Sequence, residues 1–200
     1  VVFPRDLDKG EKIAQALKED YTTTVVAYEK GGWAALQESC DLMVAVMAVG
    51  IVVRSLCPLL KDKWTDRPVV AVDSSFTCAV PVVGGHHGAN RLARLLAARL
   101  GLFPAITTAT DSSGRPCLED VACRLAASPT NKEASLAVNL AFLREDVPVL
   151  RLKGPKIVLV DDDVAVLRRK GLVVGLGSRR GVSAGEVLDA VDRALHEAGR

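Results

Sequence analysis

The sequence predicts an α/β protein built on an open, mostly parallel sheet with helices on both faces, followed by a small partial α/β unit at the C-terminal end. Strand-like and helix-like segments alternate along the chain, which is typical of sheets with crossover helices. The segment 41–48 is almost continuously apolar, as expected for a strand buried on both faces. The 49% hydrophobic content of the 200 residues is enough for one substantial core.

The first half of the chain contains most of the expected sheet. A helix is expected at 8–19, since Ile13 and Leu17 recur at helical spacing, and the β-branched run 22–28 predicts a strand. The elements expected next are a short helix at 33–39, a strand at 41–48, a helix from Gly50 through Leu60, strands at 69–73 and 78–83, and a helix at 89–100. A polar turn joins the strands at 69–73 and 78–83, so the two can form an antiparallel hairpin within the sheet.

Shorter elements are expected after residue 100. Gly101 is suited to end the preceding helix, and Ser183 with Glu186 is a capping box that starts a final helix. Between them we expect a strand at 104–108, helices at 117–127 and 131–143, and strands at 147–151, 157–160 and 172–174. The chain is accordingly divided into an N-terminal α/β domain at 1–127, a central segment at 128–170, and the start of an incomplete C-terminal domain at 171–200.

Composition and charge argue against several classes of function. The net charge of +2 gives no whole-chain attraction to nucleic acid, and the 4% aromatic content weighs against base-stacking platforms. No apolar run reaches the roughly 18 residues of a membrane helix, and no secretory leader is recognisable. Five cysteines without a CxxC motif argue against a disulfide framework and a thiolate zinc site; Cys57 and Cys78 are expected to be buried. We expect a cytoplasmic protein that binds neither nucleic acid nor membrane.

A glycine-rich loop with two adjacent histidines, GGHHGAN at 84–90, lies between an expected strand and an expected helix. In this arrangement backbone N–H groups and the helix dipole can face an anion, and the glycines permit close approach. The loop is neither a Walker motif nor a GxGxxG fingerprint. A general acid or base at His86 or His87 fits the pattern, and so does an exposed histidine beside a half-buried one that caps the helix.

A second polar segment, Thr107–Asp111, ends another expected strand. Hydroxyls and a carboxylate at this position lie where open α/β sheets bind ligands. Asp111 could equally cap a turn. The basic residues Arg54, Lys61 and Lys63 follow the strand at 41–48, and they either recognise carboxylates or form a solvated basic surface.

The glycine-rich run GLGSRRG at 175–181 imitates a dinucleotide fingerprint. No further strand with an acidic residue about 20 positions on follows it, so the match is weak. Arg179 and Arg180 instead suggest contacts with an anion or a carboxylate.

Read together, these segments resemble the cobalamin biosynthesis protein G (CbiG) family. Its Gly-Ile-x-x-Arg turn and PL-x-x-(D/N)K run are matched at 50–54 and 58–63, and its D-P-x-V-x-x-x-D strand at 66–73 with one inserted residue. Its GH-x-GG-x-N loop resembles 84–90, and ITTATD stands intact at 106–111. The opening of its C-terminal domain, G-(I/L)-G-x-R-(R/K)-G, is matched at 175–181.

The resemblance implies a cobalt-precorrin-5A hydrolase, which opens a δ-lactone on the macrocycle, releases acetaldehyde and gives cobalt-precorrin-5B. His86 or His87 would activate water, and Asp111 would orient a histidine; two histidines stand where the family has one, so the choice between them stays open. The substrate-contacting residues would be Arg54, Lys61, Lys63, Gly85, Gly88, Asn90, Thr108, Thr110, Arg179 and Arg180.

The resemblance also implies that the cobalt is carried by the tetrapyrrole substrate, so no cofactor and no metal site of the protein are expected. A homodimer is compatible with a parallel-sheet protein of this kind. Two alternatives stay open: a non-catalytic tetrapyrrole-binding protein of the same fold, and a nucleotide-binding regulatory domain, which the missing Walker lysine disfavours.

Overall fold

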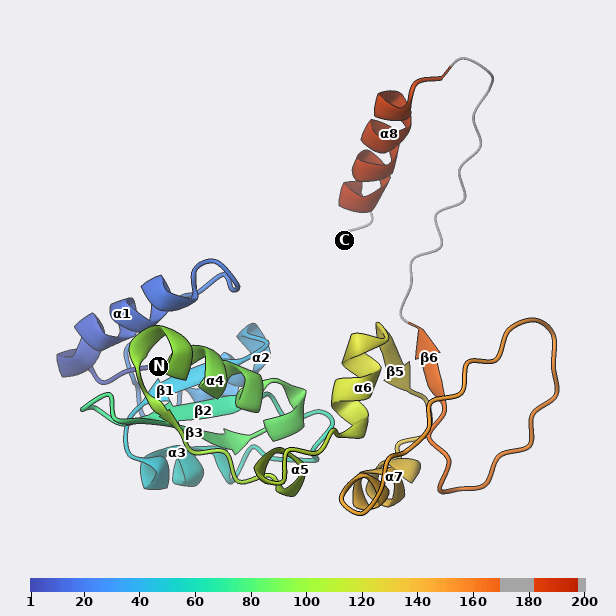
Figure 1. The fold of residues 1–200 in the computed structure, drawn as a ribbon. Coiled ribbons are helices and arrows are strands. Elements are labelled where there is room, and N and C mark those ends of the chain that lie inside the picture. The colour runs from blue at the N-terminus through green and yellow to red at the C-terminus, as the bar shows by residue number, and fades with distance from the viewer. Residues whose placement is uncertain (170–181, 198–200) are drawn as a thin grey trace.

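The structure is a computed structural model that describes residues 1–169 and 182–197. Its main body is an open four-stranded sheet in the order β1-β2-β3-β4, with helices around it (Figure 1). The strands are β1 (Met43–Val46), β2 (Val69–Val72), β3 (Cys78–Val83) and β4 (Phe103–Pro104). The predicted open α/β sheet is therefore confirmed.

The direction of the strands changes once across the sheet. β1 and β2 are parallel, β2 and β3 are antiparallel, and β3 and β4 are parallel again. The β2–β3 pair is the hairpin that the sequence predicted. Because Val69 pairs with Val83, one edge of the sheet, here called the Val83 edge, collects the starts of β1 and β2 and the end of β3. The opposite edge, called the Val46 edge, holds the ends of β1 and β2 and the start of β3.

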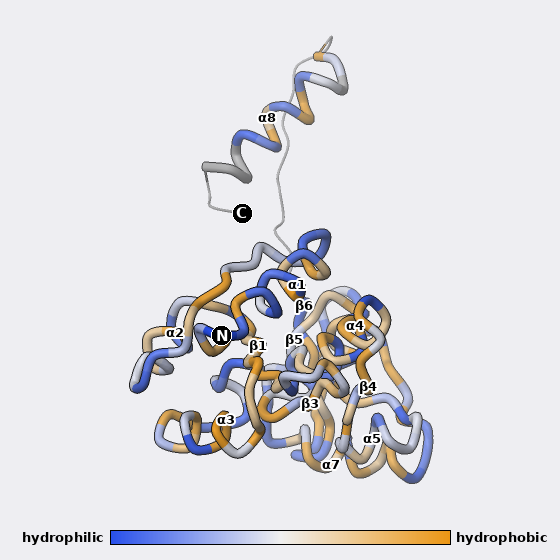
Figure 2. Tube along the Cα trace, turned by 90° about the vertical axis from the view of Figure 1, so that its left-hand side faces the viewer, coloured by the Kyte–Doolittle hydropathy of each residue, from blue (hydrophilic) through white to orange (hydrophobic). Residues whose placement is uncertain are grey.

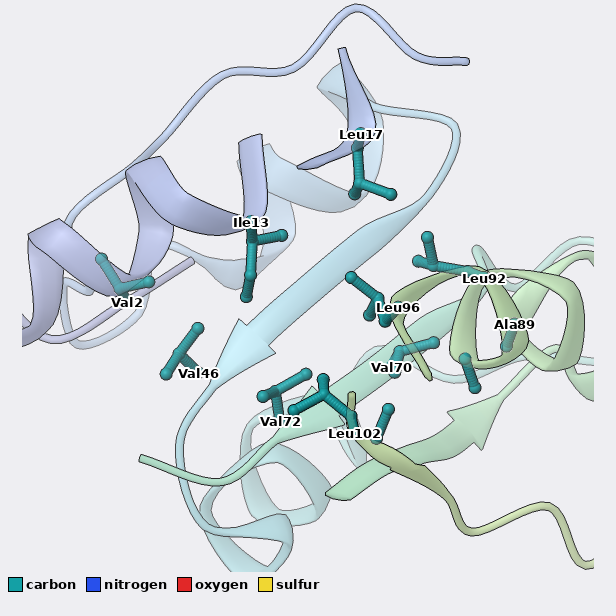
Figure 3. Packing of buried hydrophobic residues seen from close by; sticks show 12 residues of the cluster. Val2, Ile13, Leu17, Val46, Val70, Val72, Ala89, Leu92, Leu96 and Leu102 are labelled. Atoms are coloured by element: carbon teal, nitrogen blue, oxygen red, sulfur yellow. The ribbon is translucent and has the colours of Figure 1, made fainter. Parts of the chain in front are cut away.

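Helices cover both faces of this sheet. On one face α1 (Leu7–Leu17), which follows a 3-10 turn η1 (Pro4–Asp6), and α4 (Ala89–Leu100) pack over the strands. Figure 3 shows Ile13 and Leu17 of α1 meeting Leu92 and Leu96 of α4 above the β2 residue Val70. On the other face α2 (Trp33–Ser39) and α3 (Val49–Leu56) bury Trp33, Met47 and Leu56. Burial of one such side chain contributes about 1.5–3 kcal/mol, so these two cores hold the strand ends in place.

Two predicted strands are shorter than expected. In the run 22–28 only Ala27 pairs among the described residues, through an isolated bridge to Val2, and the preceding threonines are exposed. The strand expected at 104–108 ends as β4 at Pro104, and one further bond, from the Ala105 N–H to the Ala79 carbonyl, continues its path. The chain then turns into the short helix α5 (Ala109–Ser112), which the sequence did not predict.

A second, smaller unit follows. It contains α6 (Leu118–Arg124), α7 (Ala134–Phe142) and an antiparallel pair, β5 (Ala127–Pro129) with β6 (Leu167–Arg169). Leu118, Val121, Val138 and Phe142 form its core. The strands predicted at 147–151 and 157–160 are wrong: these residues pair with no strand of the described chain, and all but the half-buried Val147 are exposed. Their β-like pattern has no neighbouring strand to supply hydrogen bonds.

The C-terminal part is described from residue 182. Ser183 and Glu186 form the predicted capping box at the start of α8 (Ala184–Glu197), with their side-chain oxygens 2.8 Å apart. The strand predicted at 172–174 lies outside the described residues, and the domain boundaries stay a prediction. None of the described helices is long and apolar enough to cross a membrane.

The hydropathy colouring and the cysteines reflect the same burial. In Figure 2 the strands β1 and β3 are largely hydrophobic, whereas hydrophobic and hydrophilic residues alternate along α8. All five cysteines are free, but Cys57 is exposed and Cys78 only half-buried, so their expected burial is wrong. Cys57 caps the end of α3 on its outer side, and the buried thiol is Cys117.

Candidate functional site

The histidine loop, residues 84–90, leaves the sheet at the Val83 edge. Gly84 has a φ of 69° and Gly88 a φ of 123°, and a single 3-10 turn, η2 (Gly85–His87), lies between them. A Cβ atom on Gly84 would lie 2.8 Å from the Pro68 Cα, so the backbones there approach too closely for a side chain. The two glycines therefore turn the chain from β3 into α4 and present both histidines at this edge.

Asp111 is the centre of a hydrogen-bond network beside the loop. Its Oδ2 accepts a bond from the Thr108 hydroxyl at 2.6 Å and another from the Asn90 amide at 2.8 Å. The Asn90 amide also donates to the Thr108 hydroxyl at 2.9 Å, and Arg94 forms an ion pair with Oδ1 of Asp111. Thus α4 and α5, separated in sequence by β4, meet at one carboxylate.

This network keeps Asp111 ionised. Burial by itself raises the pKa of Asp111, but the hydrogen bonds from Thr108, Arg94 and Asn90 outweigh it and hold the pKa below its usual value. Asn90 is nearly fully buried, and its Oδ1 has no partner among the described residues. That oxygen faces Gly85, since a Cβ on Gly85 would lie 3.2 Å from it. The Asn90 amide therefore couples the loop to Asp111.

His86 is held between side chains of α5. Its Nδ1 lies 3.6 Å from Oδ2 of Asp111, and its Nε2 lies 3.4 Å from the Thr110 hydroxyl. The His86 side chain is 24% exposed, whereas Thr110 is buried. The structure thus brings together six of the predicted site residues around the loop, namely Gly85, His86, Asn90, Thr108, Thr110 and Asp111.

His87 faces a different environment. Its ring meets the Trp64 ring edge to face, with centroids 5.3 Å apart, and the Nζ of Lys63 lies 4.5 Å from the same tryptophan ring. Burial lowers the pKa of His87; the Glu119 carboxylate acts in the opposite direction, and the Lys63 charge adds to the lowering. Lys63, a predicted carboxylate-binding residue, therefore lies beside the histidine loop.

Residues of α6 and α7, in the second unit, lie on the side of the loop that carries His87 and Lys63. The Lys63 Nζ lies 3.1 Å from the Ser135 hydroxyl of α7, and that hydroxyl lies 3.4 Å from the Glu119 carboxylate of α6. The Asn139 amide donates to the other oxygen of Glu119 at 3.1 Å. Sequence reasoning did not single out Glu119, Trp64 or Asn139. The packing of α6 against the loop places Glu119, Asn139 of α7 binds Glu119, and Trp64 comes from the connection between α3 and β2.

Other predicted residues lie elsewhere. The Nε of Arg54 donates to the Gly50 carbonyl within α3, next to the Val46 edge. The Lys61 side chain is exposed and borders a shallow cavity with Arg67 on the outer side of α2. Arg179 and Arg180 lie outside the described residues. Arg94, which sequence reasoning missed, follows Asn90 by four residues, and this spacing places both on one face of a helix.

This chain is similar to known proteins of cobalamin biosynthesis. A profile of the family described as "Cobalamin synthesis G N-terminal" matches residues 33–111, a range that contains β1 to β4, the histidine loop and Asp111. A Methanocaldococcus jannaschii protein named as a probable cobalt-precorrin-5A hydrolase is 29% identical over 206 aligned positions, which cover 94% of this chain. A cobalt-precorrin-5A hydrolase of Salmonella typhimurium is 42% identical over 84 positions, covering 42% of this chain and 24% of that protein.

The relatives are longer than this chain. It spans 63% of the Methanocaldococcus jannaschii protein and 55% of a cobalt-precorrin-5A hydrolase from Priestia megaterium, with 28% identity to the latter. A crystal structure of a cobalamin biosynthesis protein G homolog from Sulfolobus solfataricus superposes with a TM-score of 0.55 and 26% identity, covering 98% of this chain and 67% of that one. In its fold, its motifs and the match at residues 33–111, this chain is similar to the cobalamin biosynthesis protein G family.

Proposed function

We propose that this chain acts in cobalamin biosynthesis as a cobalt-precorrin-5A hydrolase, opening the δ-lactone of its substrate and releasing acetaldehyde to give cobalt-precorrin-5B. One observation carries the proposal: the network of Asn90, Thr108, Asp111 and His86 stands on the histidine loop, inside the residues that match the family. The names of the curated relatives support the same activity.

Lactone opening requires a group that takes a proton from water, and the histidine loop offers two. The proton transfer falls to His86 or His87, each of which has a carboxylate nearby. A carboxylate beside an imidazole stabilises the imidazolium that forms when the proton is taken. Asp111 supplies this charge to His86, and its lowered pKa keeps it ionised.

The other two requirements are stabilisation of the oxyanion and binding of a substrate that carries many carboxylates. Backbone N–H groups at Gly85 and Gly88 are the donors for the oxyanion. The predicted role of Asn90 changes, because its amide already donates to Thr108 and Asp111 and so supports the loop. Of the predicted cations Arg54, Lys61 and Lys63, Lys63 is the one beside the loop, so it is the cation for a peripheral carboxylate. The partner of the protein is then the tetrapyrrole, cobalt enters with it as part of the substrate, and the reaction takes place in the cytoplasm.

The test is a comparison of the wild-type chain with a His86→Ala/His87→Ala double variant on cobalt-precorrin-5A. Released acetaldehyde is measured by a coupled alcohol dehydrogenase assay, and substrate binding by the absorbance of the macrocycle. We expect the double variant to lose at least about 100-fold in rate. Unchanged release would remove the histidines from the mechanism. Binding by the wild-type chain without any release would instead favour the non-catalytic tetrapyrrole-binding protein.

A further inference from the structure

The two histidines of the loop are not equivalent. Both ring nitrogens of His86 face side chains of the protein, Nδ1 toward Asp111 and Nε2 toward Thr110. Thr110 is 4% exposed, so its hydroxyl is not open to a substrate. His86 has no ring nitrogen left to meet a water molecule or a lactone unless these contacts break.

His87 is arranged in the opposite way. Within residues 1–169 and 182–197, no hydrogen bond reaches either of its ring nitrogens, and the residue is exposed at the surface of the loop. Its ring makes an edge-to-face contact with Trp64. Burial of part of the ring and the nearby charges of Lys63, His86 and Lys132 lower the pKa of His87. A neutral imidazole with free nitrogens is the form that accepts a proton.

Glu119 lies on the helix, α6, that packs against the turn carrying this histidine. Ser135 links the Glu119 carboxylate to Lys63, which lies over the Trp64 ring that His87 contacts. The carboxylate is half-buried and bound by Asn139 and Ser135. The orientation of the Asn139 side-chain amide is fixed, because its Oδ1 accepts a hydrogen bond from the Leu118 N–H at 2.8 Å. Its NH₂ group therefore points at Glu119. Burial by itself raises the pKa of Glu119, but its hydrogen bonds and the charges of His86 and Lys63 outweigh it and lower the pKa. The loop is thus flanked by two ionised carboxylates, Asp111 from α5 and Glu119 from α6.

We propose that His87 is the proton-transferring histidine of the site and that Glu119, which lies outside the family match at 33–111, is its positioning residue. The proposal rests on the proposed lactone hydrolysis. A ring nitrogen of His87 takes a proton from water as the water oxygen attacks the lactone carbonyl carbon. The ring C–O bond then breaks, and the imidazolium returns the proton to the leaving oxygen. Glu119 stabilises the imidazolium between these steps, and His86, bound to Asp111 and Thr110, forms a fixed wall of the site.

The first test needs no substrate. The imidazole nitrogens of ¹⁵N-labelled wild-type chain and of a Glu119→Gln variant are titrated by NMR. Gln can keep the bond network of Asn139 but carries no charge, so the His87 pKa should fall in the variant. Glu133→Gln, an exposed residue at the start of α7, is the matched control and should leave His87 unchanged. If the His87 pKa is the same in wild type and Glu119→Gln, Glu119 is not its partner.

The second test separates the histidines by activity. His87→Gln should lower kcat by about 100-fold or more, with a smaller change in KM, and His86→Gln should lower it less. Glu119→Gln should lower kcat and move the acidic limb of its pH profile to lower pH. A larger loss in His86→Gln than in His87→Gln would overturn the assignment while leaving the hydrolase activity in place. A wild-type chain without activity would count against the proposed function alone, and the titration would still decide whether Glu119 and His87 are paired.

Discussion

Replacing Gly84 by alanine tests the close approach that shapes the histidine loop. The substitution introduces two costs. A non-glycine residue in the left-handed region costs about 1–2 kcal/mol, and Gly84 has a φ of 69°. The new Cβ would also lie 2.8 Å from the Pro68 Cα, a backbone atom that cannot rotate away, and overpacking of this kind costs about 1–3 kcal/mol. The expected loss of unfolding free energy is about 2–5 kcal/mol.

Gly101 is a matched control. Its φ of 74° is nearly the same, but no atom lies within 4 Å of the place where a Cβ would stand. Gly101→Ala should therefore cost only the backbone strain, about 1–2 kcal/mol. Both variants are measured by urea unfolding, followed by far-UV circular dichroism. Equal losses in the two variants would refute the argument that packing against Pro68, rather than backbone strain alone, requires glycine at position 84.

Three further predictions concern stability and reactivity. Burial by itself raises the pKa of Asp73, but backbone N–H groups of the following turn lower it to about 2. A carboxylate with a lowered pKa stabilises the fold above pH 4, and this stabilisation is lost as the pH falls toward 2. Asp73→Asn should therefore remove a pH-dependent contribution of at most about 2 kcal/mol to the free energy of unfolding, measured by urea unfolding at pH 5 and pH 2.5. Burial raises the pKa of the Cys117 thiol to about 12, so Ellman's reagent should modify the exposed Cys57 and Cys123 quickly and Cys117 only on unfolding. Leu96→Ala, in the fully buried core between α1 and α4, should cost about 2–5 kcal/mol in the same unfolding assay; a loss below 1 kcal/mol would contradict this packing.

Much of the sheet could be predicted because its local patterns agree with its tertiary role. The apolar strands β1 and β2 and the amphipathic helix α4, ended by Gly101, are visible in the sequence and stand close to where they were expected. The segments at 147–151 and 157–160 have an equally convincing strand pattern and form no strand. A strand needs a neighbouring strand to share its hydrogen bonds, and a local sequence pattern does not show whether such a strand is present.

The candidate site divides in the same way. Asn90, Thr108, Thr110, Asp111 and both histidines could be found from glycine-loop and strand-end patterns, because each lies at a junction that such patterns mark. Arg94 could also have been predicted from the sequence, since it follows Asn90 by about one helical turn. Glu119 and Trp64 could not be found, because the sequence gives no measure of how α6, or the connection between α3 and β2, packs against the loop.

The single reversal of strand direction between β2 and β3 has a practical use. It places the histidine loop and the turn after β2, which contains the exposed Ser74 and Ser75, at opposite edges of the sheet. A fluorophore or an immobilising linker at position 75 would therefore stand one full strand length away from the histidine loop. Such an attachment offers a distance reporter for a coloured ligand added to the protein, by energy transfer, without altering the loop.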